Sequence, residues 1–248
     1  MSVKISIITA TSNSAHTIEK CIHSLKNQSY SNLEYILIDN DSSDGTQNLI
    51  AQHEKFISRL VSEPDDGVYS ALNKGIKLAT GDLIGFLHSD DIMLNGTLNL
   101  IAGKYRPDTI LTGQLLRPIS DGAIIIKRNK SLSNLKCEMA INHPATFVPA
   151  AIFRQIGLFD TNYTIAADYK FICQCWLNSI KFEFIEKPLV QFAYSGLSDR
   201  QRLLSYKENR RIQKELKLNN PLTTNLTFAR KVILLPFKRA LRKFLYDI

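Results

Sequence analysis

The sequence predicts an α/β protein with a doubly wound, mostly parallel β-sheet that carries helices on both faces. Over the first hundred residues, short β-branched or apolar segments alternate with segments whose apolar residues recur at helical spacing. Loops rich in Ser, Asn, Asp and Gly separate these segments. Parallel strands joined by crossover helices form such a sheet, and ligands collect at the carboxyl ends of its strands.

The first strand and the first helix have clear signals. Residues 3–9 form a β-branched run that ends in "ATSNSA", small polar residues suited to a loop. The segment 17–26 follows, and one face of the predicted helix carries Ile18, Cys21, Ile22 and Leu25.

The alternation continues to residue 91. Asp44 and Gln47 resemble a capping pair at the start of the second helix, and Gly81 lies near the C-terminal cap of the third. The predicted elements of this part are strands at 33–39, 56–63 and 82–91 and helices at 44–53 and 68–81.

From residue 107 the alternation is less regular. Pro149 suits the first turn of a short helix, and a longer helix begins near Asp168. A boundary near residue 197 separates a domain at 1–197 from a polar, basic and helical extension at 198–248. The predicted elements are strands at 109–116, 122–128 and 142–148 and helices at 149–157 and 166–179.

The net charge of +8 belongs to the end of the chain. Residues 201–248 contain 12 Lys or Arg and 3 Asp or Glu, whereas the first 200 residues contain 19 basic and 20 acidic side chains. The main body is therefore not a polycationic reader of nucleic acid. We expect neither a membrane-spanning helix nor a signal peptide. The four cysteines lack the paired spacing of zinc or redox sites, which predicts reduced, mostly buried thiols in a cytoplasmic protein.

Adjacent carboxylates at the end of a buried strand favour a divalent metal site. Three polar clusters, at 9–14, 39–44 and 88–91, follow predicted strands and are expected at one rim of the sheet. Mg²⁺ and Mn²⁺ prefer carboxylate oxygens and leave positions for water and substrate phosphate. Asp90 and Asp91 therefore fit a metal that bridges a diphosphate. Alternatively, Asp91 caps a turn in a polar loop.

Other polar residues fit nucleotide binding, each with a structural alternative. Asp39 ends the second strand, where its carboxylate either accepts a hydrogen bond from a base N–H or serves as a turn residue. Asp65 precedes a helix that contains Lys74, whose ammonium either neutralises phosphate oxygens or lies at the solvated surface. Asp41 and Asp44 fit a turn role better.

Asp168 is a candidate general base. It lies at a predicted helix N-terminus, where the helix dipole favours the ionised carboxylate. The alternative is a helix cap. His143, in "NHPATF", is a candidate ligand contact, although a lone His is more often a structural residue.

Taken together, five segments resemble the family 2 glycosyltransferases, which are inverting nucleotide-sugar enzymes of GT-A fold. The segments are "SIITATSN", "SLKNQSYSNLEYILIDNDSSDGT", "SEPDDGVYSALNKGIKLATGDLIGFLHSDD", "NHPATF" and "AADYKF". Their order and spacing make the resemblance specific, and it covers residues 3–195. The long central block is similar to bacterial members that build O-antigen, capsule or related polysaccharides.

The resemblance implies how the donor binds. Asp39 would bind the nucleobase, which is uracil by family habit, so UDP-sugars are favoured. Thr9 and Ala10 would lie against the nucleoside. Asp65 with Lys74 would hold the base or the diphosphate.

The resemblance also implies the chemistry. Asp90 would lie near the ribose, and Asp91 would ligate Mn²⁺ or Mg²⁺, which offsets the charge of the leaving nucleotide. Asp168 would take the proton from an acceptor hydroxyl that attacks the opposite face of the anomeric carbon. His143 would lie in the loop that approaches the sugar or the acceptor. One in-line displacement of this kind inverts the anomeric configuration.

Two positions depart from the family pattern. Ala10 stands where relatives usually carry Pro, which removes a rigid residue from the first loop. Ala167 stands where many relatives carry Glu, so a second carboxylate beside Asp168 is missing.

The basic extension is expected to contact a membrane. An amphipathic helix with flanking Lys and Arg suits an anionic surface, and a polyprenyl-diphosphate-linked acceptor would require one. The predicted location is therefore cytoplasmic, on the inner face of the cytoplasmic membrane. The alternative is an ordinary helix packed on the domain. The residues of the predicted apolar face are Phe237, Ala240, Leu241 and Phe244.

Other functional classes fit the sequence less well. A nucleotidyltransferase that makes nucleotide-sugars usually has a Gly-rich, basic loop after the first strand, and "ATSNSAH" has neither feature. A nucleic-acid-binding protein is disfavoured by the near-neutral body. A non-catalytic nucleotide-sugar-binding module is the remaining alternative, if Asp91 or Asp168 is misplaced.

Overall fold

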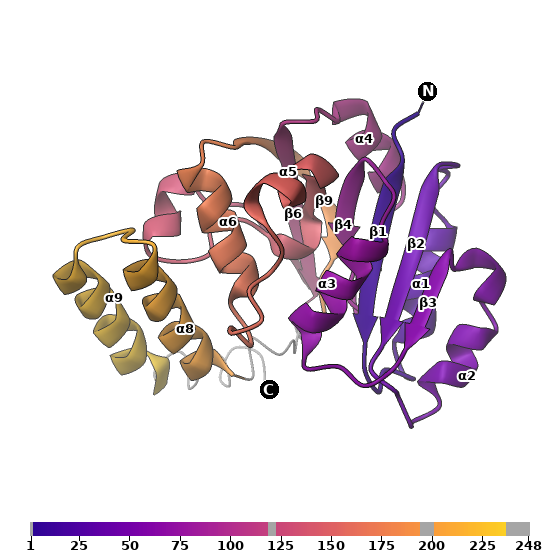
Figure 1. Ribbon diagram of the computed structural model, residues 1–248, viewed down its shortest axis with the longest axis horizontal. Helices are drawn as coiled ribbons and strands as arrows, with labels where there is room; N and C mark the ends of the chain where they lie inside the picture. Colours follow the sequence, from indigo (N-terminus) through magenta and orange to yellow (C-terminus); the bar gives the residue numbers. More distant parts are fainter. Residues whose placement is uncertain (1, 119–122, 194–200, 237–248) are drawn as a thin grey trace.

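One β-sheet forms the centre of the computed structural model, which describes residues 2–118, 123–193 and 201–236 (Figure 1). The strand order is β3-β2-β1-β4-β8-β6-β9-β5, and β7 pairs with β6. Strands β3, β2, β1, β4, β6 and β9 share one direction, and β5, β7 and β8 run opposite to them. The predicted mostly parallel sheet is confirmed. The strands are β1 (Ile5–Thr11), β2 (Leu33–Asp39), β3 (Arg59–Ser62), β4 (Leu83–Phe86), β5 (Ile92–Met93), β6 (Thr109–Pro118), β7 (Ile124–Lys127), β8 (Thr146–Pro149) and β9 (Lys181–Gln191).

Helices cover both faces of this sheet. Side chains of β1 alternate between two buried cores: Ile5 and Ile7 pack with α1 and α4, and Ile8 packs with α3, α5 and α6. This alternation confirms the doubly wound arrangement. The helices are α1 (Ile18–Lys26), α2 (Thr46–Ala51), α3 (Val68–Leu78), α4 (Thr97–Lys104), α5 (Ala150–Ile156), α6 (Ala167–Leu177), α8 (Arg202–Glu215) and α9 (Pro221–Ile233), with 3-10 turns η1 (Glu54–Phe56), η3 (Leu132–Lys136) and η4 (His143–Ala145).

Helix ends differ in detail from the sequence predictions. The four apolar residues predicted for one face of α1 are all buried. Asp44 accepts hydrogen bonds from the amide and hydroxyl of Thr46, but the side chain of Gln47 reaches Asp39 instead of completing a capping box. Helix α3 ends at Leu78, before Gly81. A Cβ on Gly81 would lie 2.5 Å from the Ser6 hydroxyl oxygen, so this glycine permits close packing rather than capping the helix.

The carboxyl ends of the first strands meet at one edge of the sheet. In the pairing register, Thr11 of β1 lies beside Asp39 of β2, and Asp39 lies beside Ser62 of β3. Beyond the end of β4, the Leu87 amide donates to the Ile8 carbonyl, which keeps this segment beside β1. The predicted rim therefore exists, and Figure 1 shows these strand ends close together.

The last described elements form a helical hairpin on the body. Helix α8 packs on α6 through Ile212, which is fully buried, and α9 packs on α8 (Figure 1). No helix in 2–118, 123–193 or 201–236 combines the length and apolar character needed to span a membrane. The predicted apolar face formed by Phe237, Ala240, Leu241 and Phe244 lies outside the described residues.

Three elements were absent from the sequence predictions: β5, α4 and β9. The predicted third strand is shorter than expected and forms an exposed edge as β3. All four cysteines are free, and Cys21, Cys173 and Cys175 are buried, as predicted.

Candidate functional site

Hydrogen bonds join three loops at the carboxyl edge of the sheet. The Asn13 amide donates to the Ser42 hydroxyl (2.8 Å), which connects the loops after β1 and β2. The hydroxyls of Ser14 and Ser89 lie 2.9 Å apart, which connects the loop after β1 to the loop after β4. The polar clusters that follow β1, β2 and β4 thus form one surface.

The loop after β4 carries two acids in different environments. Asp90 is exposed, whereas Asp91 is fully buried. The Ala193 amide donates to Oδ1 of Asp91 (2.9 Å), and Oδ2 has no hydrogen-bond partner among the described residues. Burial, reinforced by the charge of Asp90, raises the pKa of Asp91 well above its ordinary value. A buried carboxylate oxygen without a donor is a position that a cation would stabilise.

Asp168 is the second residue of α6 and is partly exposed, with 20% of its side chain accessible. The N-cap residue of α6 is Ala166. Asp168 therefore does not have the alternative role that the sequence suggested, that of a helix cap. Its Oδ1 accepts hydrogen bonds from the Tyr69 hydroxyl (2.9 Å) and from the Tyr169 amide (2.8 Å). Its Oδ2 lies 4.0 Å from Nδ1 of His143. One carboxylate oxygen is therefore held by two donors, and the other lies beside His143.

His143 connects Asp168 to the loop after β4. Its ring stacks on Phe86, with centroids 5.2 Å apart, and lies 6.4 Å from the ring of His88. Burial lowers the pKa of His143 to about 4; Asp168 opposes this shift and His88 adds to it. Burial also lowers the pKa of His88. Both imidazoles are therefore neutral at pH 7.

Asp39 is buried at the end of β2, and its carboxylate is fully hydrogen-bonded. Oδ1 accepts from the Ser42 hydroxyl (2.5 Å), and Oδ2 accepts from the Ser42 amide (3.1 Å), the Gln47 amide group (3.2 Å) and the Ser62 hydroxyl (2.7 Å). This network holds the loop after β2. The predicted contact with a nucleobase stays a prediction, and it would require one of these donors to give way.

Asp65 and Lys74 lie together, as their predicted joint role requires. The Lys74 ammonium is 2.5 Å from Oδ1 of Asp65 and 2.6 Å from a carboxylate oxygen of Glu63. Hydrogen bonds to Asp65 and then to Glu63 raise the pKa of Lys74, which stays charged. The Asp65 amide donates to the side-chain oxygen of Asn40 (2.6 Å), which attaches this pair to the rim beside β2.

Thr9 and Ala10 lie inside the sheet rather than on its rim. Thr9 is fully buried, and its hydroxyl donates to the Leu87 carbonyl (2.7 Å) and accepts from the Tyr35 hydroxyl (3.2 Å). Ala10 belongs to the core on the opposite face. Thr11 is the last residue of β1, and its buried hydroxyl has no partner among the described residues.

Sequence reasoning missed Tyr69 and Thr11 as site residues. Tyr69 lies in the first turn of α3, and burial raises the pKa of its hydroxyl well above 10, so it is a proton donor to Asp168 at neutral pH. The two residues are 99 positions apart, and no local pattern indicates their contact. Thr11 lies two residues after the end of the predicted strand 3–9, and its place in the polar cluster 9–14 was the available signal.

A second group of metal-ligand residue types lies on the far side of α1. Potential ligand atoms of Glu19, His23 and His53 lie within 4.8 Å of one another. The Lys26 ammonium, however, is 2.7 Å from Nδ1 of His53. An ammonium has only protons to offer, so this contact places the ring proton on Nε2, which then cannot bind a metal. We do not assign a metal site there.

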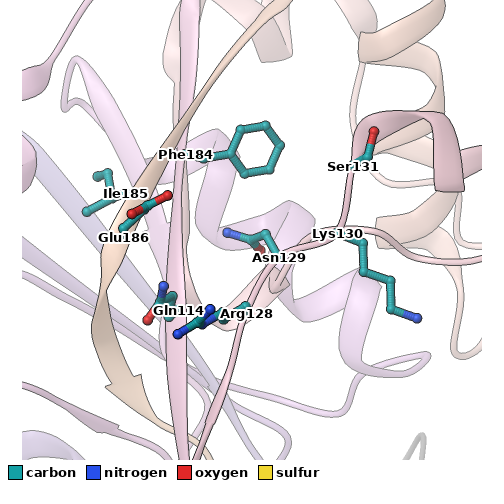
Figure 2. A pocket seen from close by; sticks show the side chains of 8 residues that line it. All are labelled: Gln114, Arg128, Asn129, Lys130, Ser131, Phe184, Ile185 and Glu186. Carbon is teal, nitrogen blue, oxygen red and sulfur yellow. The ribbon is translucent and has the colours of Figure 1, made fainter.

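A cavity of about 250 Å³ lies beside β6 and β9, away from the acids (Figure 2). Gln114 comes from β6, Phe184 and Glu186 come from β9, and the remaining wall is the segment 128–131. None of the predicted site residues lines this cavity. Asn129 connects this cavity to the loop of His143, because its side-chain oxygen accepts a hydrogen bond from the backbone amide of Asn142 (2.8 Å).

Comparisons with known protein sequences identify the family of this chain. The sequence model described as glycosyl transferase family 2 matches residues 6–157, more than half of the chain. The chain is 25% identical over 227 residues to a protein of Escherichia coli named UDP-Glc:alpha-D-GlcNAc-diphosphoundecaprenol beta-1,3-glucosyltransferase WfgD, covering 77% of this chain and 90% of that one.

Solved structures share the fold at low sequence identity. Residues 1–349 of Staphylococcus aureus TarS, in complex with UDP-GlcNAc, give a TM-score of 0.71 at 18% identity over 92% of this chain and 71% of that one. The chain covers 43% of the longer TarS chain. A mannosyltransferase of Pyrobaculum calidifontis, in complex with GDP-Man and Mn²⁺, gives 0.64 at 16% identity over 98% of this chain and 81% of that one. The fold is therefore GT-A, and the chain belongs to glycosyl transferase family 2.

Proposed function

We propose that the chain transfers a sugar from a nucleotide-diphosphate sugar, with UDP-sugars favoured, to a hydroxyl of a lipid-diphosphate-linked saccharide. The product would be part of a bacterial surface polysaccharide such as O-antigen or capsule. The observation that carries the proposal is a succession of contacts from the acid pair to the partly exposed carboxylate of Asp168. The loop of Asp91 begins at His88, His88 lies beside His143, and His143 lies beside Asp168. The E. coli relative, whose name combines a UDP-sugar donor with a diphosphoundecaprenol acceptor, supports it.

Asp168 is the general base of this proposal. Its Oδ1 is held by Tyr69 and by the Tyr169 amide, which fixes the carboxylate, and Oδ2 is left to accept a proton. The proton moves from the acceptor hydroxyl to Oδ2 as the hydroxyl oxygen attacks the anomeric carbon and the bond to the nucleotide diphosphate breaks. A single in-line displacement inverts the anomeric configuration.

Asp91 is the proposed ligand of Mn²⁺ or Mg²⁺, with Asp90 near the ribose. Support comes from the buried Oδ2 of Asp91, which lacks a donor, and from the raised pKa of this carboxyl. A bound cation would make the ionised form favourable, because its charge replaces the missing donor. When bound, the cation would offset the negative charge of the leaving nucleotide diphosphate. The P. calidifontis mannosyltransferase, whose complex contains Mn²⁺, adds support.

Donor binding would use the residues around the end of β2. We propose that Asp39 accepts a base N–H at Oδ2 in place of Gln47 or Ser62, with Thr9 and Ala10 supporting the nucleoside from within β1. Asp65 and Lys74 would hold the base or the diphosphate. A phosphate would compete with Glu63 for the Lys74 ammonium, since that pair is the more exposed of the two.

A transfer assay tests the proposal on the whole chain. UDP-, GDP- and dTDP-sugars would be tried with a lipid-diphosphate saccharide acceptor, in Mn²⁺ and in EDTA. We expect turnover with one donor, dependent on the cation. Asp168→Asn should lower kcat by about 10²- to 10⁴-fold with little change in donor KM, since general-base catalysis contributes on that order.

Asp160→Asn is the control for that variant, because Asp160 lies in the same segment and bonds to Lys170 instead. It should keep the kcat of the native chain. Full activity in Asp168→Asn would refute its role as the base. Donor binding without transfer or hydrolysis under any condition would identify a non-catalytic binding module instead.

We also propose that the extension at 198–248 contacts the anionic inner face of the cytoplasmic membrane. Leu222, Leu226 and Ile233 of α9 are 69%, 61% and 66% exposed, and their spacing puts them on one helical face. Residues 201–248 have 12 basic and 3 acidic side chains, a balance of +9. An apolar helix face in a basic segment suits an anionic lipid surface.

Sedimentation with phosphatidylglycerol vesicles tests the membrane contact. The double variant Leu226→Ser with Ile233→Ser should leave most of the protein in the supernatant. Leu60→Ser, at an exposed leucine on edge strand β3, should sediment like the native chain. Equal sedimentation of the double variant and the native chain would contradict the proposal.

A further inference from the structure

Glu208 of α8 is a buried carboxylate whose hydrogen bonds all lead to the segment before Asp168. Its Oε1 accepts from the Thr164 amide (2.9 Å), and its Oε2 accepts from the amides of Ile165 and Ala166 (2.9 Å each). Only 8% of Glu208 is exposed. Three charge-assisted bonds from consecutive backbone amides fix this segment relative to α8.

The Ala166 amide belongs to the N-cap residue of α6, where a helix leaves N–H groups without internal partners, and the Thr164 and Ile165 amides lie just before it. The N-cap residue Ala166 makes no side-chain cap hydrogen bond, because alanine has no acceptor to offer. Glu208, on a helix about forty residues further along the chain, instead accepts from the amide of the N-cap residue itself and from the two amides before it, so it fixes the segment that leads into α6. Its negative charge also lies at the positive end of the α6 dipole.

The same segment is coupled to Asp168 through Tyr69. The Tyr69 hydroxyl lies 2.7 Å from the Ile165 carbonyl oxygen and 2.9 Å from Oδ1 of Asp168. A phenol has one proton, so these two acceptors share it. A shift of Ile165 would change that sharing, and with it the hydrogen bond that orients the Asp168 carboxylate.

We propose that Glu208 is a positioning residue for Asp168, so that α8 belongs to the catalytic unit although it lies in the C-terminal extension. The proposal rests on the proposed role of Asp168 as general base. Glu208 touches no reacting atom; it holds the 164–166 backbone, which sets the start of α6 and the acceptor that competes for the Tyr69 proton. A displacement of about 1 Å at a catalytic group is enough to reduce turnover by about 10²-fold.

The test compares Glu208→Gln and Glu208→Ala with Glu215→Gln in the transfer assay. Glu215 lies on the same helix and accepts hydrogen bonds from Tyr163 and Lys170, which are also in the segment that carries Asp168 but, among the described residues, make no hydrogen bond to Tyr69 or to the Asp168 side chain. Glutamine keeps one acceptor oxygen, so Glu208→Gln should fold. We expect kcat to fall about 10-fold in Glu208→Gln and about 100-fold in Glu208→Ala, with donor KM within twofold of the native value.

The control separates positioning from general destabilisation. Glu215→Gln should lower the melting temperature about as much as Glu208→Gln and leave kcat within twofold of the native value. The inference is overturned if kcat of Glu208→Gln equals that of Glu215→Gln, or if kcat and KM change in parallel with the melting temperature. Where Glu208→Ala does not fold, Glu208→Gln alone decides.

Asp168→Asn, measured beside these variants, distinguishes a failure of the Glu208 positioning role from a failure of the Asp168 base assignment. If Asp168→Asn loses activity and Glu208→Gln does not, the positioning role fails while the proposed function stands. If Asp168→Asn is fully active, the base assignment fails, and the positioning role fails with it.

Discussion

Asp39 and Asp91 are both fully buried carboxylates, and their hydrogen bonding differs. Asp39 accepts four hydrogen bonds from Ser42, Gln47 and Ser62. Asp91 accepts one from the Ala193 amide, and its second oxygen has no donor among the described residues. Buried polar groups are normally satisfied, so this oxygen of Asp91 is the atom at which the proposed cation would have its largest effect.

Glu34 is a third buried acid, and it has a structural role whose pH dependence follows from its contacts. Burial alone would raise its pKa, but hydrogen bonds from Ser6, Thr80 and Lys4 outweigh burial and lower the pKa to about 2. Between pH 4.5 and pH 2 the unfolded chain therefore binds a proton that the folded chain does not. The free energy of unfolding therefore decreases as the pH is lowered from 4.5 to 2. The stabilising contribution of the ionised Glu34 is complete above pH 4.5.

Glu34→Gln should lower the free energy of unfolding by about 2–3 kcal/mol at pH 7. The difference from the native chain should shrink as the pH falls from 4.5 towards 2. Urea unfolding at pH 7, 4 and 3 measures it. Glu54→Gln, at an exposed position, should differ little from the native chain at every pH. A Glu34→Gln deficit that is as large at pH 3 as at pH 7 would contradict this account.

At the scale of elements, helix α3 lies close to β1 because it carries a glycine at the contact. A Cβ on Gly75 would lie 2.4 Å from Cγ2 of Ile8, a fully buried core residue. The helix also provides Tyr69 and Lys74 to the rim, so its distance from the sheet sets the position of both. Gly75 permits the close packing of α3 on β1, and this packing sets where Tyr69 and Lys74 lie at the rim.

Gly75→Ala should lower the free energy of unfolding by up to about 2 kcal/mol. The overpacking cost of about 1–3 kcal/mol exceeds the gain of about 1 kcal/mol in helix propensity. The control is Gly103→Ala in α4, where an added Cβ has nothing within 4 Å. That variant should be as stable as the native chain or up to about 1 kcal/mol more stable. Thermal unfolding of both compares them, and a stabilised Gly75→Ala would refute the close contact.

Periodic apolar patterns predicted the elements whose burial is decided locally. The face of α1 and the runs that form β1, β2 and β4 are examples, since each is apolar over most of its length. Strand β9 was not predicted, because Glu183, Glu186 and Pro188 interrupt its pattern. It is a strand because it pairs with β6 along most of its length, and that pairing is a tertiary contact without a local signal.

At the scale of the whole molecule, the rule that ligands collect at the carboxyl ends of parallel strands predicted the rim. From the sequence alone, this rule predicted that Asp39, Asp90 and Asp91 lie at one edge of the sheet. It did not predict the contacts that complete the site. Tyr69 meets Asp168 across 99 positions, and Glu208 meets Ile165 across 43. Such contacts depend on how α3, α6 and α8 pack, which neither composition nor periodicity encodes.

The account depends most on the cation at Asp91, and titration calorimetry of Mn²⁺ in the presence of UDP tests it directly. The native chain should bind one ion, and Asp91→Asn should weaken binding by on the order of 100-fold, because a neutral amide replaces the charged ligand. Asp82→Asn, at the amino end of β4, should bind within twofold of the native chain. Native affinity in Asp91→Asn, or loss of binding in Asp90→Asn alone, would contradict the assignment.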